Sequence, residues 1–400
     1  MPAGASRHAG ASPHAGASRH AGASPHAGAS RHAGASRHAG GSRHGRAGRQ
    51  GRLTGTRGRT RAALSAVAVV VLAGGAFLFV RTAADGTPGN AAGPPQGSGT
   101  TAGSPSPRPR PAKRLPVGRI GSYAVADRSL VLVDTSRARL AGRRVLPTLV
   151  RYPVIPARAA AAGGLARGLF PLVLFAPGYL QCDGSYRSLL HSWASAGYVV
   201  AGVEFPRTSC HAASPDEADL ANQPGDMSFV IRRLLAISGR PHGVLSGLVN
   251  PAAIAVAGHS DGGDTVAAMV ANTCCLDHKV SAAVILAGAE WPPLRGSYFA
   301  RRSPPILFVQ GNADNINLPA DSQLMYRADT KGPRFYLDLF GAGHLTPYEG
   351  DGSPEPVVAQ VTTDFLNRYV AGQPSASAAM QRAGDVAGIA VLVHGKKPPP

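Results

Sequence analysis

Ile254–Gly263 reads IAVAGHSDGG, and the rest of the fold can be worked out from this stretch. Its first four residues form a short apolar run with the length of a buried strand. Gly-His-Ser-Asp-Gly follows at once, and an apolar stretch at helical spacing comes next, with Val266, Ala267, Met269 and Val270 on one face. A G-x-S-x-G pattern between a strand and a helix is typical of a nucleophile elbow, a turn so tight that the positions beside the serine must carry almost no side chain. We therefore predict that Ser260 is a nucleophile; the alternative is a glycine-rich turn without chemistry.

Short apolar runs alternate with helical segments on both sides of this motif. The expected strands cover residues 124–134, 144–153, 171–176, 198–203, 254–257, 280–287, 305–310 and 334–340. Besides the helix after the elbow, the expected helices cover residues 185–196, 226–237, 319–328 and 356–370. Such alternation predicts an α/β fold with a doubly wound, mostly parallel sheet flanked by helices, in one catalytic domain over residues 117–372.

Two polar residues follow later strands of this sheet, where sites form at the carboxyl ends of the strands. Asp314 lies in Gly-Asn-Ala-Asp after strand 305–310, and His344 ends Gly-Ala-Gly-His after strand 334–340. A serine hydroxyl is a poor nucleophile, so we expect His344 to take its proton and Asp314 to orient the imidazole. Asp338 is a rival for the acid, but it lies within a strand.

An oxyanion needs two backbone N–H donors beside the nucleophile. One is expected from Asp261, directly after Ser260, and the other from Tyr179, in the loop after strand 171–176. The ring of Tyr179 would line the acyl pocket, with Trp291 as the opposite wall. The alternatives are a surface aromatic for Tyr179 and plain packing for Trp291.

Four cysteines lie in the globular part and allow three pairings. Cys182 and Cys210 are in loops after adjacent expected strands at one sheet edge, so they are the preferred pair. The adjacent Cys274 and Cys275 are not expected to form an ordinary unstrained bridge with each other. His211 beside Cys210 suggests a metal only faintly, because further ligands with suitable spacing are missing, and no metal site is predicted.

The net charge of +19 is concentrated near the N-terminus. Residues 1–61 carry eleven Arg and no acidic residue, whereas residues 117–400 carry 25 basic and 21 acidic residues. Seven His in residues 1–61 belong to a repeated six-residue unit rich in Ala, Gly and Ser, which has nothing to bury and is expected to be disordered. Because the folded part is nearly balanced in charge, nucleic acid is not an expected partner.

Ala62–Val80 is a run of nineteen residues without a charge, enough to span about 28 Å as a helix. Arginines precede it and few charges follow, which predicts a single-pass signal-anchor in the cell membrane with the catalytic domain outside the cytoplasm. The alternative is a signal peptide cleaved near Ala83-Ala84, giving a secreted protein. Residues 81–116 are expected to be a flexible linker, and residues 373–400 a loosely attached tail.

Four motifs together resemble a known family: Pro-Gly-Tyr at 177–179, Gly-His-Ser-x-Gly-Gly at 258–263, Gly-x-Ala-Asp-x-Ile at 311–316 and Gly-Ala-Gly-His at 341–344. Over roughly residues 140–370 the chain is similar to the bacterial cutinase, polyester hydrolase and platelet-activating-factor acetylhydrolase-like branch of the α/β-hydrolase superfamily. The resemblance implies a serine esterase that cleaves carboxylic esters through an acyl-enzyme intermediate and needs no cofactor.

The sequence departs from the polyester hydrolases at two places. Asp261 replaces the apolar residue, often Met, that follows their nucleophile, and loop 206–224 is longer and acidic. Both departures favour a small or medium, more polar ester over a long apolar polymer. Two alternatives remain: an acyltransferase on envelope lipids or sugars with the same triad, and a non-catalytic envelope-binding protein.

Overall fold

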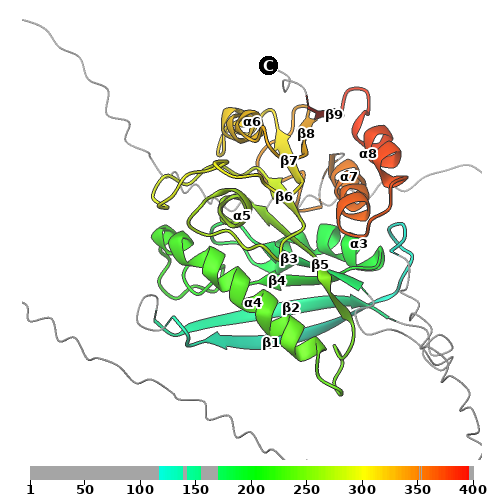
Figure 1. Ribbon diagram of the computed structural model, residues 1–400. Helices are drawn as coiled ribbons and strands as arrows, with labels where there is room; N and C mark the ends of the chain where they lie inside the picture. The colour runs from blue at the N-terminus through cyan, green and yellow to red at the C-terminus, as the bar shows by residue number, and fades with distance from the viewer. Residues whose placement is uncertain (1–116, 138–141, 155–169, 351, 353, 396–400) are drawn as a thin grey trace, which may run out of the picture. The chain divides into compact units, whose positions relative to one another are not determined.

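The computed structural model describes residues 117–137, 142–154, 170–350, 352 and 354–395. Their strands form one sheet in the order β1-β2-β4-β3-β5-β6-β7-β8-β9 (Figure 1). The strands are β1 Val125–Asp134, β2 Arg144–Pro153, β3 Phe170–Ala176, β4 Val199–Val203, β5 Val249–His259, β6 Ala282–Leu286, β7 Ile306–Gly311, β8 Arg334–Leu339 and β9 Ala390–His394. The inner strands from β4 to β8 pair in parallel, while β1, β2 and β9 join antiparallel at the two edges.

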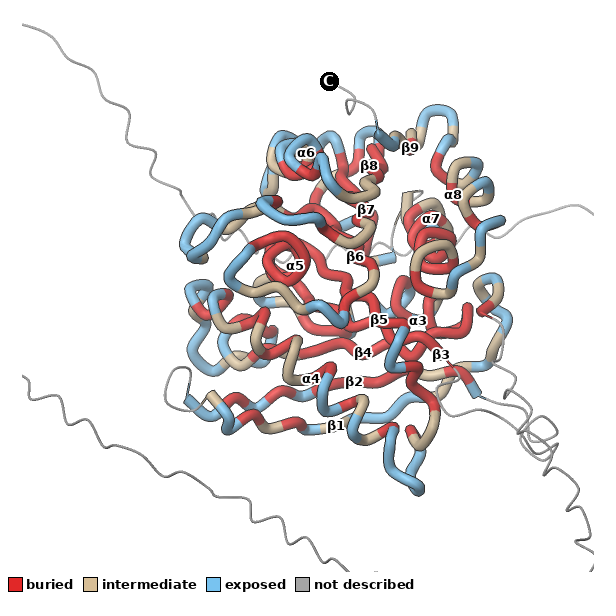
Figure 2. Tube along the Cα trace, in the orientation of Figure 1, coloured by how far each residue is buried: buried red, intermediate tan, exposed pale blue. Residues whose placement is uncertain are grey.

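Helices cover both faces of this sheet. The helical elements are η1 Asp183–Tyr186, α3 Arg187–Ser195, η2 Glu217–Asn222, α4 Gln223–Ser238, α5 Asp261–Ala271, α6 Pro319–Ala328, α7 Pro354–Tyr369 and α8 Ala376–Gly384. Alternate residues of β3 point to opposite faces: Leu172 and Leu174 join the core under α4, α5 and α6, and Val173 and Phe175 join the core under α3 and α7. Figure 2 shows β3, β4 and β6 buried in the sheet, and helix α5 buried where it covers one face. This mixed sheet with helices is consistent with the α/β-hydrolase fold.

The C-terminal segment corrects one prediction, because residues 373–395 are not a loosely attached tail. Helix α8 packs against α7 and places Met380 in the core, and Arg368 Nε donates a hydrogen bond to Ser377 Oγ at 3.0 Å. Strand β9 extends the sheet by pairing antiparallel to β8, with Leu337 opposite Leu392. The local sequence gives only a short Val-rich run there. Its pairing depends on β8, a contact between distant segments that periodicity cannot reveal.

The predicted N-terminal regions lie outside the described residues. These are the basic tract 1–61, the apolar run Ala62–Val80 and the linker 81–116. Within the part of the chain that the structure describes, no helix is both long enough and apolar enough to cross a bilayer. The signal-anchor therefore stays a prediction from the sequence.

One disulfide ties together the loops that follow β3 and β4. Cys182 and Cys210 are bonded, with their α-carbons 5.4 Å apart and a sequence separation of 28. Gln181 and Ser209 form a β-bridge beside the bond, and the Leu180 N–H in the loop after β3 donates to the Thr208 carbonyl in the loop after β4 at 2.7 Å. The bridge thus braces the loop that carries Tyr179.

The second disulfide corrects the expectation for the adjacent cysteines, because Cys274 and Cys275 are bonded to each other. Their α-carbons are 3.8 Å apart, below the ~4.4–6.8 Å of ordinary bridges. A tight turn after α5 makes the pairing possible. In it, Asn272 accepts hydrogen bonds from both cysteine N–H groups, through its side chain for Cys274 and its carbonyl for Cys275. The Cα–Cα distances of ordinary disulfides therefore do not predict a bond between adjacent cysteines in such a turn.

Candidate active site

Ser260 lies in a sharp turn between β5 and α5. Its backbone has φ 54° and ψ −124°, a left-handed conformation that is costly for a residue with a side chain. A Cβ at Gly262 would collide with the carbonyl oxygen of Ala176, and one at Gly258 with that of Gly262. These contacts explain the two glycines of the motif. The turn is held by a hydrogen bond from the Ser260 N–H to the Leu286 carbonyl at 3.0 Å.

Asp314 and His344 meet at the carboxyl ends of β7 and β8. His344 Nδ1 lies 2.8 Å from Asp314 Oδ2 and donates to it, so the neutral ring keeps Nε2 as its proton acceptor. Gln310 Nε2 and the N–H of Ile316 also donate to Asp314, at 3.0 and 2.9 Å. Burial alone would raise the pKa of Asp314, but these hydrogen bonds and the nearby imidazole outweigh it and hold the pKa below its usual value. Asp314 is therefore ionised and able to balance an imidazolium.

His259 connects the turn at Ser260 to the loop that carries His344, and the sequence motifs assigned it no role. Its Nε2–H donates to the backbone carbonyl of His344 at 2.9 Å, and its Nδ1 accepts from the Tyr186 hydroxyl at 2.9 Å. The Gly178 N–H in turn donates to Tyr186 Oη at 3.2 Å. Burial, helped by the charge of His344, lowers the pKa of His259 to about 3, so it stays neutral. This relay joins the loop after β3 to the loop that carries His344.

The expected oxyanion donors lie on either side of Ser260. Asp261 is the first residue of α5, where backbone N–H groups have no partner within the helix. The loop after β3 approaches closely, since a Cβ on Gly178 would lie 3.1 Å from Ser260 Cβ. Tyr179 follows in this loop and is half-buried, and Leu180 after it has φ 56°. The backbone N–H groups of Asp261 and Tyr179 thus both belong to segments that lie close to Ser260. That they bind an oxyanion stays a prediction.

Two other residues that the sequence suggested, Asp338 and Trp291, do not contact Asp314 or His344 in any hydrogen bond of the described residues. Asp338 lies in β8 between Gln310 and Val391, and burial raises its pKa to about 6. The acid that contacts His344 is Asp314. Trp291 lies after β6, is half-buried and donates its backbone N–H to Tyr298 Oη at 3.2 Å. That contact describes packing within its own loop and leaves its role as a pocket wall untested.

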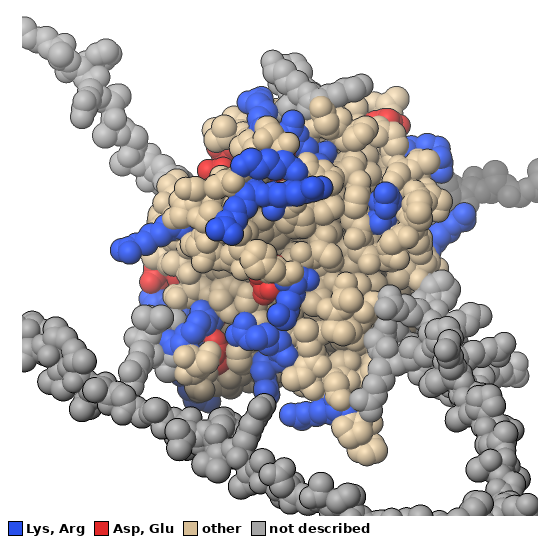
Figure 3. Space-filling view, in the orientation of Figure 1, with Lys and Arg blue, Asp and Glu red and all other residues tan. Residues whose placement is uncertain are grey.

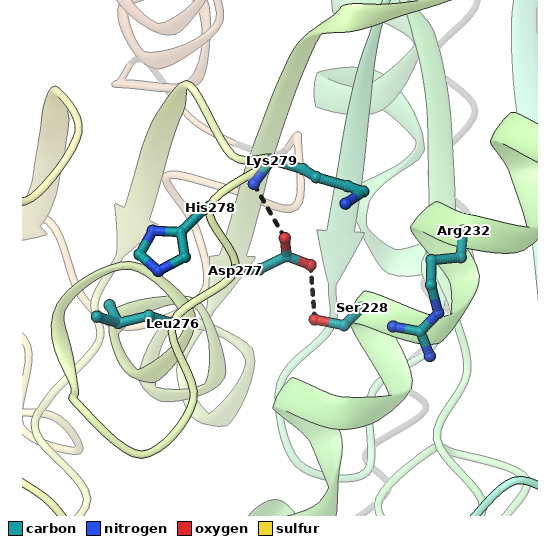
Figure 4. Close-up of a pocket in the computed structure, with 6 residues that line it drawn as sticks. All are labelled: Ser228, Arg232, Leu276, Asp277, His278 and Lys279. Atoms are coloured by element: carbon teal, nitrogen blue, oxygen red, sulfur yellow. Dashed lines mark hydrogen bonds between the residues drawn. The ribbon is translucent and has the colours of Figure 1, made fainter. Parts of the chain in front are cut away.

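Two further polar groups lie away from the elbow. Cys182, Cys210 and His211 come close enough to hold an ion, but both sulfurs are in the disulfide, and His211 Nδ1 contacts Glu204 at 3.0 Å. A surface pocket between α4 and the loop after α5 is held by Asp277, which accepts from Ser228 Oγ at 2.8 Å (Figure 4). The other residues lining it are Arg232, Leu276, His278 and Lys279. It contains none of the elbow residues.

Lys and Arg side chains lie at several separate places on the face drawn in Figure 3, and Asp and Glu are fewer there. No single basic groove dominates that face.

Comparison with known proteins gives one clear result. A search of curated proteins finds no match to this chain. A family model described as PETase, PET hydrolase-like, matches residues 163–378, which is more than half of the chain and runs from before β3 to the first turn of α8. The elbow and the Asp314–His344 pair both fall inside the match. The chain belongs to the PET hydrolase-like family of the α/β-hydrolases, in the branch of cutinases and polyester hydrolases.

Proposed function

We propose that this protein is a serine esterase that hydrolyses small or medium carboxylic esters through an acyl-enzyme intermediate. Membership of the family supports ester hydrolysis in general. The observation that carries the finer assignment is the Asp314–His344 hydrogen bond of 2.8 Å, together with a serine held in a strained turn directly after His259, which bonds to the His344 carbonyl. Ser260 would be the nucleophile, His344 the base and Asp314 the acid.

The proposed reaction has two halves. In the first, Ser260 Oγ attacks the ester carbonyl carbon while His344 Nε2 takes the hydroxyl proton. The C–O bond to the alcohol then breaks, and the alcohol leaves with that proton. In the second half, water attacks the acyl carbon, His344 takes a proton from it, and the carboxylic acid leaves as Ser260 is reprotonated. The N–H groups of Asp261 and Tyr179 would stabilise the oxyanion in both halves.

Two alternative functions follow from the same fold. An acyltransferase would pass the acyl group to a lipid or sugar hydroxyl instead of water, so product analysis with an added alcohol separates it from a hydrolase. A non-catalytic binding protein has no need of a strained serine, because such strain is kept where surrounding structure and function require it. The strain at Ser260 therefore favours an enzyme.

The location outside the cytoplasm is also a proposal. It rests on Ala62–Val80 and gains support from the two disulfides, which persist in oxidising compartments. Extraction of membranes with alkaline carbonate tests it: an anchored protein stays in the pellet. A soluble form that begins near residue 85 would instead indicate signal-peptide cleavage.

The test of function is a panel of p-nitrophenyl esters of increasing acyl length, with Ser260→Ala as the matched control. We expect the wild type to prefer short or medium chains, and the variant to lose on the order of 10⁴–10⁶-fold in kcat. Equal rates in both proteins would remove the assignment of Ser260.

A further inference from the structure

We propose that the carboxyl group of Asp261 recognises the substrate, by accepting a hydrogen bond from an O–H or N–H donor that the ester carries within a few bonds of the scissile carbonyl. This inference rests on the proposed function and narrows its substrate class to donor-bearing esters.

The first observation is the unsatisfied state of this carboxyl group. Asp261 is only 9% exposed, directly after Ser260, and none of the described residues hydrogen-bonds to its buried Oδ2. Buried polar atoms are normally paired, because leaving one unpaired loses its hydration without replacement. An unpaired acceptor beside the nucleophile is therefore in place to bind a donor that arrives with the substrate.

Neighbouring carboxyl groups show the usual arrangement. Asp264, one turn further along α5, accepts from the Ala289 N–H at 2.6 Å. Asp314 accepts from His344 and from Gln310. Both of these carboxyl groups are fixed by the protein's own donors, so Asp261 differs from them although it lies in the same part of the fold.

The surroundings of Asp261 carry more negative than positive charge. Burial and, to a smaller extent, the carboxylate of Glu217 raise the pKa of Asp261, the charge of His344 lowers it, and together they bring the pKa to about 7. Burial is the main cause that raises the pKa of Asp264 on the same helix and of Tyr186 in η1, and the negative charge of Asp261 raises both pKa values further. A cationic or hydroxylic donor would relieve this excess, whereas an apolar group would not.

The acidic loop is held in place beside the elbow. Thr265 Oγ1 in α5 donates to Gln223 Oε1 at 2.6 Å, and Gln223 Nε2 donates to Thr208 Oγ1 at 2.8 Å. The Thr208 carbonyl also accepts from Leu180 in the loop after β3. This chain of contacts attaches the start of the loop 206–222, and with it Glu217, to the first turns of α5. The loop that carries Glu217, whose charge adds to burial in raising the pKa of Asp261, is thus fixed relative to α5.

The experiment compares kcat/KM within three pairs of esters that differ only in the donor. The pairs are ethyl 3-hydroxybutanoate with ethyl 3-methylbutanoate, 2-hydroxyethyl butanoate with propyl butanoate, and protonated 2-(dimethylamino)ethyl butanoate with 3-methylbutyl butanoate. The first pair places the donor on the acyl side, the second and third on the alcohol side, and the third adds a positive charge. We expect the wild type to favour the donor ester about tenfold or more in at least one pair, since a site built for a hydrogen bond rejects the analogue that lacks it.

Two variants of the full chain decide whether Asp261 is the cause. Asp261→Met should bring the favoured ratio close to one, through loss of activity on the donor ester. Asp261→Asn keeps the shape and an acceptor oxygen, so it should retain most of a hydroxyl preference and lose an ammonium preference. Labelling of Ser260 by a fluorophosphonate shows which variants keep an intact elbow. If Asp261→Met is not labelled, the test is made with Asp261→Asn instead, and a loss of the preference within the ammonium pair supports the role of Asp261.

The possible outcomes separate this inference from the proposed function. Ratios within about threefold in all three pairs for the wild type, or a preference unchanged in Asp261→Met, would overturn the inference while leaving an esterase. A wild type that hydrolyses none of the six esters and is not labelled at Ser260 would overturn both.

Discussion

Two buried groups of charged residues in this molecule have opposite character. Near the start of β2, Arg144 forms a paired contact with Asp219 at 2.6 and 2.7 Å and bonds to Asp226 at 2.5 Å. Arg137 completes this group, which we call the arginine cluster, by bridging Asp226 and Asp134. At the elbow, by contrast, Asp261 makes no ion pair with any of the described residues, and Ser260 is held in a strained backbone conformation.

The difference distinguishes charged groups that stabilise the fold from charged groups that are available for a reaction. In the arginine cluster, burial lowers the pKa of Arg144, but the hydrogen bonds to Asp219 and Asp226 outweigh this and hold its pKa above the usual range. Each charged side chain of the arginine cluster forms an ion pair with another member of the cluster. At the elbow, by contrast, no donor among the described residues reaches the buried Asp261 Oδ2. A buried charged group indicates function when its partners are incomplete.

The largest expected effect concerns the catalytic side of this comparison. Asp314→Asn should lower kcat by about 10⁴-fold with little loss of stability, because the amide no longer holds His344 in the tautomer that accepts the serine proton. Steady-state kinetics on a p-nitrophenyl ester measures it. Asp338→Asn is the control and should change kcat less than about threefold. A large loss in the control and none in Asp314→Asn would make Asp338 the acid.

The arginine cluster should respond in stability instead of rate. Arg144→Met leaves Asp219 and Asp226 buried without their main partner, which should cost about 3–5 kcal/mol in the free energy of unfolding. Urea denaturation followed by circular dichroism measures this. Arg207→Met removes an exposed contact to Asp216 of 3.0 Å and should cost about 1 kcal/mol or less. Similar losses in both variants would mean that the cluster is not the stabilising unit described here.

Asp261 should make the folded state less stable as the pH rises. Its pKa is near 4 in the unfolded chain and about 7 when folded, so the folded state binds the extra proton between those values. The ionisation of Asp261 therefore does not change the free energy of unfolding below about pH 4, and it lowers that free energy by at most about 4 kcal/mol above about pH 7. Asp261→Asn should be more stable than the wild type at pH 8 and no more stable near pH 4. A stability difference that does not vary with pH would show that this carboxyl is satisfied in the fold.

The smallest expected effect separates the two disulfides. Replacing Cys182 and Cys210 by Ser opens a loop of 28 residues and should cost roughly 3 kcal/mol, with lower activity because the loop carries Tyr179. Replacing Cys274 and Cys275 by Ser opens no such loop, so thermal unfolding should change little. Equal shifts in the melting temperature of the two double variants would contradict this assignment.

Much of this fold was predictable because its strands and glycine turns are local signals. The elbow, the central strands and the positions of Asp314 and His344 follow from short motifs and chain order. The contacts that these elements make with distant segments could not be predicted from the same motifs. Tyr186 reaches His259 across 73 residues, and β9 finds β8 only through the folded sheet. The pairing of Cys274 with Cys275 depends on one turn geometry, which spacing does not encode.

The central claim is that Ser260 is a covalent nucleophile activated by His344. Incubation of the full protein with a fluorophosphonate probe, followed by digestion and mass spectrometry, tests this most directly. We predict one modified peptide, with the probe on Ser260, and no labelling in Ser260→Ala or after unfolding in urea. A wild type that stays unlabelled, or a probe found on another serine with equal labelling of Ser260→Ala, would contradict the claim.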